Sequence, residues 1–188
     1  MRDPFPFPPS PLLQNLSSPI ANAFSLPTLP LHIHEIALSA LLYTFIYTIV
    51  SPRLSPLLFP RTYPTLPPRT KRNWDVHVVS LVQASFINVA ALWVMWKDGE
   101  RWGMGWEERV WGYSGAGGMI QAFAAGYFVW DLAICVGNVG IFGVGLLAHA
   151  VSALVVFALG FVSSLRLLFN LPPVFAPSGE WQTAKDEF

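Results

Sequence analysis

Apolar residues gather in four runs, each long enough to form a helix that crosses a lipid bilayer. Such a helix needs about 20 residues at 1.5 Å each. None of the 17 prolines lies within 31–51 or 69–171, where helices are expected. The pattern predicts an all-α, polytopic transmembrane helical bundle with four clear spans, over residues 31–50, 74–96, 116–137 and 141–162.

The segments outside these runs are rich in proline or polar residues. Residues 1–30 hold eight prolines, which predicts a disordered or extended N-terminal tail. The membrane domain is expected over 31–170. Residues 171–188 contain further prolines and polar residues and are expected to form a polar C-terminal tail. The sequence leaves open whether this short C-terminus is natural or truncated.

Composition and charge narrow the classes of function. Hydrophobic residues make up 53% of the chain and charged residues 12%, whereas a soluble domain carries about 25% charged residues. An integral membrane protein is therefore expected. Lys+Arg and Asp+Glu number 11 each, so no nucleic-acid partner is expected. Residues 51–73 carry basic side chains and no acidic one, which places this segment in the cytosol and the N-terminus in the lumen.

Four polar side chains within the spans are candidate pocket residues. Asp131 is costly in an apolar run, by about 2.5–3.5 kcal/mol at a helix centre. If the chain turns at Gly140, the midpoint between Asp131 and His149, these two lie at a similar depth on antiparallel helices. Gln83 is expected beside them, roughly 9–14 Å below the cytosolic surface. Tyr127 shares a helical stripe with Asp131.

The role of Asp131 and His149 is open on sequence alone. They can serve as a general base and its orienter, as in acyl transfer. They can line a pocket that handles a ligand without catalysis, or form a buried ion pair that only sets helix packing. One His and one Asp are too few ligands for a metal site, and no cofactor is expected.

Two further patterns indicate structural roles. His32 and His34 begin the first span, but residues i and i+2 of a helix face different sides, so no metal site is predicted there. Gly118, Ala122 and Gly126 recur every four residues and form a smooth face for close helix packing. The same face offers a contact to other membrane proteins.

Three stretches resemble the TLC domain family of multi-span membrane proteins. They are WDVHVVSLVQA at 74–84, GYFVWDL at 126–132 and the pair Ala148-His149. The likeness covers about residues 72–170 and is to the lipid-homeostasis type of the family. The resemblance implies membrane lipids as partners, a place in the endoplasmic reticulum or another endomembrane, and a non-enzymatic role in lipid sensing, transport or membrane composition.

The chain also departs from the family pattern. Gln83 stands where the family usually has His, and Ala148 replaces the first His of a pair. No acidic residue lies between His149 and Glu180, so the ceramide synthase signature is absent and acyl-CoA-dependent acylation of a sphingoid base is not expected. Two alternatives stay beside lipid handling. One is a lipid acyltransferase related to ceramide synthases that uses Asp131 and His149, and the other is a structural membrane subunit without a ligand.

Overall fold

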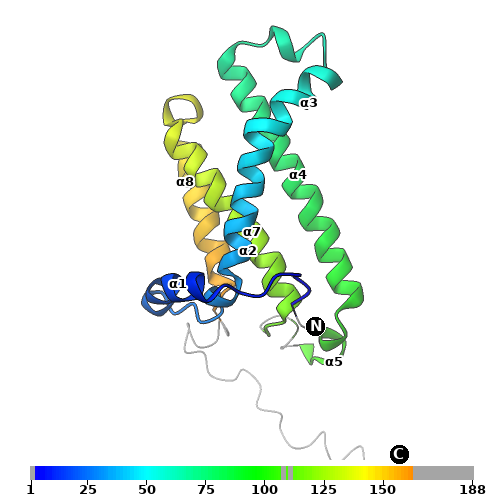
Figure 1. The fold of residues 1–188 in the computed structure, drawn as a ribbon, viewed down its shortest axis with the longest axis vertical. Coiled ribbons are helices and arrows are strands. Elements are labelled where there is room, and N and C mark those ends of the chain that lie inside the picture. Colours follow the sequence, from blue (N-terminus) through cyan, green and yellow to red (C-terminus); the bar gives the residue numbers. More distant parts are fainter. Residues whose placement is uncertain (1–2, 107–108, 110–111, 163–188) are drawn as a thin grey trace, which may run out of the picture.

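The computed structural model describes residues 3–106, 109 and 112–162, and within these ranges the chain forms helices and no β-strand (Figure 1). The chain is an all-α, polytopic membrane protein, as its sequence predicts. Four of its helices are long and apolar enough to cross a membrane. They are Leu29–Leu58 (α2, Leu29–Phe45, with η1, Ile46–Val50, and α3, Ser51–Leu58), α4 (Pro68–Lys97), α7 (Gly115–Gly137) and α8 (Val139–Leu159).

The pair α2 and α7 forms the centre of the bundle. These two helices pack against each other, α8 folds back along α7, and α4 contacts α7 and η1. The basic connection between α3 and α4, which includes the short helix η2 (Tyr63–Thr65), lies at one end of the molecule (Figure 1). The N-terminal segment, α1 (Pro11–Ala23) and α5 (Gly99–Gly103) lie at the other end (Figure 1).

Small residues allow α2 and α7 to approach closely. A Cβ atom added to Gly126 would lie 2.5 Å from the carbonyl oxygen of Ile36, and one added to Gly118 would collide with the His32 ring. Ala122 is fully buried between them. The small-residue face is therefore filled by α2 of the same chain. Contact with another membrane protein through this face stays a prediction, and it would require α2 to move aside.

The first 30 residues differ from the disordered or extended tail that their prolines predict. Residues 11–23 form α1, and α2 already begins at Leu29. Pro11 and Pro30 lie in the first turn of these helices, where the missing N–H leaves no intrahelical hydrogen bond unmade. Pro19 lies inside α1 and removes a single bond. The position of a proline within a helix therefore matters more than the number of prolines.

The first span continues through prolines that the sequence pattern assigns to the following loop. Pro52 and Pro56 lie within α3, which extends the helix from the predicted end at residue 50 to Leu58. A proline ring in an α-helix collides with the carbonyl group four residues earlier. The wider π-helical turn of η1 ends at Val50, two residues before Pro52, and includes the backbone that this proline ring would meet. In the same way α4 begins at Pro68, six residues before the predicted span.

The third and fourth spans begin and end within three residues of their predicted bounds. Asn138 separates α7 from α8, so the chain reverses within the stretch that the glycines mark. However, α8 is interrupted at Gly143, where φ is +82° and ψ is 165°. Glycine adopts such a positive φ without steric cost. The tail predicted over 171–188 lies outside the described residues.

Candidate functional site

Polar side chains from α2, α4 and α7 meet inside the bundle. The Tyr43 hydroxyl donates to Gln83 Oε1, and the Tyr127 hydroxyl lies 2.9 Å from Ser80 Oγ. Tyr127 is the donor in the second bond, because the Ser80 hydroxyl donates to the Val76 carbonyl at 3.0 Å. The two tyrosine rings meet edge to face with centroids 5.5 Å apart. The structure thus brings the predicted residues Gln83 and Tyr127 into one cluster.

Tyr43 is the member of this cluster that the sequence does not reveal. It is 1% exposed and supplies the hydrogen-bond donor to Gln83. A tyrosine in an apolar run is equally typical of the headgroup region, where one end of the ring is apolar and the other is wet. The sequence hints at Tyr43 only through Gln83. A buried amide needs a hydrogen-bonding partner on a neighbouring helix, and Tyr43 is that partner.

Asp131 lies one helical turn beyond Tyr127 and is 6% exposed. Its contact within the described part of the chain is weak, since Cys135 Sγ lies 3.9 Å from Oδ1. No Lys, Arg or His of the described residues forms an ion pair with it. A carboxylate offers about four acceptor positions, so most of the hydrogen-bonding capacity of Asp131 is unused. The adjacent Trp130 also has a buried indole N–H without a partner.

Asp131 and His149 lie near enough to interact electrostatically, but they make no direct contact within the described residues. His149 is exposed on α8, and within the described residues neither a hydrogen bond nor an ion pair joins the two side chains. The assignment of both residues to a lipid site stays a prediction, and the contact that general-base catalysis uses is not made.

Another buried carboxylate lies toward the basic end of the bundle. Asp75 accepts a hydrogen bond from Ser51 Oγ at 2.6 Å and lies 3.1 Å from the Tyr63 hydroxyl through each of its oxygens. Burial, followed by the nearby Asp75 carboxylate, raises the pKa of Tyr63 to about 12, so this phenol is a protonated donor at neutral pH. Asp75 is therefore satisfied by the chain itself and has a structural role.

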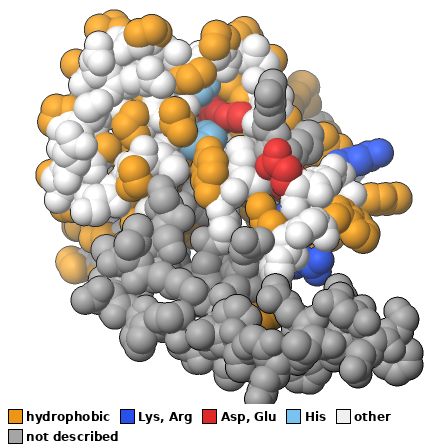
Figure 2. Space-filling model, turned by 90° about the horizontal axis from the view of Figure 1, so that it is seen from below, with side chains coloured by type: hydrophobic (Ala, Val, Ile, Leu, Met, Phe, Trp, Pro, Cys, Tyr) orange, Lys and Arg blue, Asp and Glu red, His pale blue; other side chains and the backbone are white. Residues whose placement is uncertain are grey.

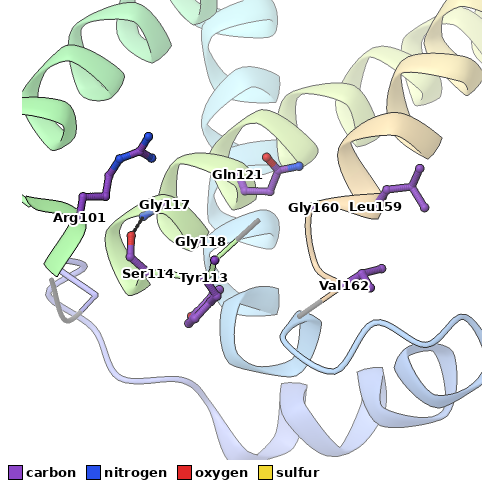
Figure 3. A pocket seen from close by; sticks show the side chains of 10 residues that line it. Arg101, Tyr113, Ser114, Gly117, Gly118, Gln121, Leu159, Gly160 and Val162 are labelled. Atoms are coloured by element: carbon purple, nitrogen blue, oxygen red, sulfur yellow. Dashed lines mark hydrogen bonds between the residues drawn. The ribbon is translucent and has the colours of Figure 1, made fainter. Parts of the chain in front are cut away.

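A cavity of about 190 Å³ opens at the opposite end of α7 from Asp131 (Figure 3). Its lining comes from the start of α7, the end of α8 and Arg101. Ser114 Oγ, one of the lining groups, accepts the Gly117 N–H at 3.2 Å and caps α7. The volume is below the 300–1,000 Å³ (roughly) of small-molecule pockets. None of the four predicted site residues lines this cavity.

Comparison with known proteins identifies the family. The model of the TLC domain matches residues 73–171, which is just over half of the chain. The chain belongs to the TLC domain family. It is 39% identical over 149 residues to an uncharacterized TLC domain-containing protein of Schizosaccharomyces pombe. It is 30% identical over 130 residues to Topoisomerase I damage affected protein 4 of Saccharomyces cerevisiae.

These alignments cover 79% and 68% of this chain but only 49% and 44% of the two relatives. The chain thus spans about half the length of the relatives that it matches. No solved structure matches it. The TLC region begins within α4 and contains Gln83, Tyr127, Asp131 and His149, whereas α2 and its Tyr43 lie before it. The protein is a membrane TLC domain protein.

Proposed function

We propose that this TLC domain protein handles a lipid inside the membrane without catalysing a reaction, and that it serves lipid homeostasis through sensing, transport or membrane composition. The observation that carries the proposal is Asp131. This carboxylate is almost fully buried in a membrane-spanning helix, and within the described chain its partner is a weakly interacting thiol. Ionisable groups at such positions are costly and mark functional sites by default.

The chemistry of Asp131 indicates the class of lipid. An ionised carboxylate only accepts hydrogen bonds, so it favours a lipid whose polar part carries hydroxyl or amine donors. Tyr127 and the Gln83–Tyr43 pair lie beside it on the packed side of α7. His149 lies on the exposed side of α8, where lipid has access. As part of the same proposal, we place the protein in the endoplasmic reticulum or another endomembrane.

The alternatives receive less support from the described contacts. A purely structural carboxylate is expected to accept strong hydrogen bonds from the chain, as Asp75 does from two hydroxyls and Asp131 does not within the described residues. An acyltransferase that uses Asp131 and His149 needs these two side chains to come into hydrogen-bond contact during the reaction, whereas in this structure they interact only at longer range. Lipid handling without chemistry requires only the unused acceptor capacity of Asp131.

The test is lipidomics on cells that carry the wild type, a deletion, or Asp131→Asn at matched protein levels. Asn has the shape of Asp but no charge, so this variant leaves helix packing intact. We expect Asp131→Asn to reproduce the change that the deletion causes in one lipid class, and His149→Ala to cause a smaller change in that class. His77→Ala, which removes an exposed histidine of α4, is the matched control and should resemble the wild type.

Two results would overturn the proposal. A deletion without any change in lipid composition would refute the role in lipid homeostasis. A deletion phenotype that Asp131→Asn does not share would show that Asp131 belongs to the scaffold.

A further inference from the structure

A second group of ionisable side chains lies at the start of α2, outside the region that the TLC model matches. His32 and Glu35 are one helical turn apart and 1% and 0% exposed, and His32 Nδ1 lies 3.0 Å from Glu35 Oε2. Asp3 of the N-terminal segment places Oδ2 3.4 Å from the same nitrogen. We propose that His32, Glu35 and Asp3 bind a divalent transition-metal cation of the Zn²⁺ class.

The separations of these atoms suit a shared cation. One ligand atom from each of the three residues lies within 4.8 Å of the others. A cation with bonds of about 2.0–2.2 Å in tetrahedral or octahedral geometry holds neighbouring ligand atoms roughly 3.0–3.6 Å apart. Both measured distances from His32 Nδ1 fall in this range. Asp3 lies outside the helices, so its carboxylate can close on the cation without moving α2.

The charge of the group also calls for a cation. Two carboxyl groups face a single imidazole, so the group holds more acids than bases. Within the described residues, no Lys or Arg forms an ion pair with Asp3 or Glu35. Buried charge without compensation costs several kcal/mol (roughly) in proteins. A divalent cation supplies the missing positive charge at the point where the two carboxylates converge.

Neighbouring groups hold two of the ligands in a binding orientation. A metal-binding histidine usually directs its second ring N–H to an acceptor, which fixes the tautomer. His32 Nε2 lies 2.6 Å from the Tyr113 hydroxyl, which leaves Nδ1 for the metal. The Phe5 N–H donates to Asp3 Oδ1 at 2.9 Å and turns Oδ2 toward His32.

Glu35 supplies an independent indication of a ligand. Its Oε1 atom is buried and has no hydrogen-bond partner among the described residues, although the residue is fully enclosed. His34 Nε2 lies 3.7 Å from this oxygen, but the nitrogen donates instead to the Phe7 carbonyl at 3.1 Å. His34 Nε2 is thus engaged elsewhere, and the proposed site departs from the sequence-based expectation that the start of this span holds no metal. The ligands beside His32 come from position i+3 and from the N-terminal segment.

The donor set selects the type of metal. One imidazole and two carboxylates suit Zn²⁺ and similar first-row cations, whereas Ca²⁺ takes six to eight oxygen ligands (about) and soft metals prefer thiolates. Three protein ligands leave at least one position open for water or another small ligand. The Asp3 side chain is 31% exposed, so the site has access to solution. Figure 2 views this end and shows acidic and histidine side chains next to one another.

The test is metal binding by the full chain, purified in detergent with an affinity tag that contains no histidine and stripped of metal with a chelator. Zn²⁺ is titrated by calorimetry, and Co²⁺ by its visible absorption. We expect one equivalent of each to bind. Asp3→Asn and Glu35→Gln should each weaken Zn²⁺ binding by more than 100-fold (roughly), and Tyr113→Phe by about 10–100-fold, as for other outer-shell partners.

Matched controls separate this site from adventitious binding. His77→Ala and His149→Ala remove exposed histidines of α4 and α8 and should leave the Zn²⁺ affinity unchanged. Asp3→Asn alters one atom of a residue outside the helices, so loss of fold does not explain its effect, and circular dichroism verifies this. The proposal is overturned if no single equivalent binds, if Asp3→Asn and Glu35→Gln bind as the wild type does, or if the control variants lose the binding.

Discussion

Two buried carboxylates at opposite ends of the first span differ in their surroundings. Asp75, near α3, receives hydrogen bonds from the Ser51 and Tyr63 hydroxyls. Glu35, near the start of α2, contacts His32, faces Asp3 and has one oxygen without a partner in the described part of the chain. Burial alone therefore does not indicate function. A carboxylate enclosed by neutral donors belongs to the scaffold, whereas one that shares an imidazole with a second carboxylate is suited to a cation.

The largest effect is expected from Asp75→Ala. This change leaves the buried Tyr63 hydroxyl without its acceptor and leaves Ser51 only the longer contact with Ser55 Oγ at 3.3 Å, so the free energy of unfolding should fall by about 2–4 kcal/mol. Thermal unfolding in detergent, followed by circular dichroism, measures the loss. It should be the same with Zn²⁺ and with chelator. Asp75→Asn, which keeps one acceptor oxygen, should lose less, and an unchanged melting temperature for Asp75→Ala would contradict a structural role.

A smaller loss of stability is expected from Tyr63→Phe. The free energy of unfolding should fall by about 1 kcal/mol, because one hydrogen bond is lost. Because the pKa of Tyr63 is raised from 10.0 to about 12 in the folded protein, its contribution is complete below pH 10 (about) and is lost as the pH rises toward 12. The difference in melting temperature between wild type and Tyr63→Phe should therefore shrink over that interval. A difference in melting temperature that grows with pH would contradict the expected loss of the Tyr63 hydrogen bond at high pH.

The smallest effect on stability is expected from Glu35→Gln in the presence of chelator. The change removes the repulsion between two carboxylates and keeps the shape of the side chain, so the free energy of unfolding should change by less than about 1 kcal/mol, toward higher stability. With Zn²⁺ at 100 times the dissociation constant of the wild type, the wild type should gain about 2.7 kcal/mol and the variant less than about 0.4 kcal/mol. A large loss of stability in chelator would instead make Glu35 part of the scaffold, like Asp75.

Much of the fold follows from the sequence because the relevant physics is local. The third and fourth spans and the turn at Asn138 follow from apolar length and from glycines. The packing of Gly118 and Gly126 follows from four-residue spacing. Prolines are harder to interpret, since Pro11 lies in a first turn and Pro52 follows a π-helical turn, and no composition count reveals either.

The polar clusters are less accessible from the sequence. Gln83 and Tyr127 stand out as polar groups in apolar runs, but their link passes through Tyr43, which resembles any membrane tyrosine. Asp131 stands out for the same reason, whereas residue spacing can place His149 near it but does not show whether the two side chains touch.

The sequence by itself determined that this chain crosses a membrane with four helices and carries a buried acid in the third. The free energy of transferring a helix into lipid is a sum over about 20 consecutive residues. It can therefore be evaluated without knowing which other helices pack against that helix. The tertiary structure alone decided which buried polar atoms meet. Asp3, His32 and Tyr113 are far apart along the chain. They meet because of the orientation of α2 about its axis and the path of the N-terminal segment. Hydrogen bonds and metal ligation act over about 3 Å, so they depend on placements that local sequence does not specify.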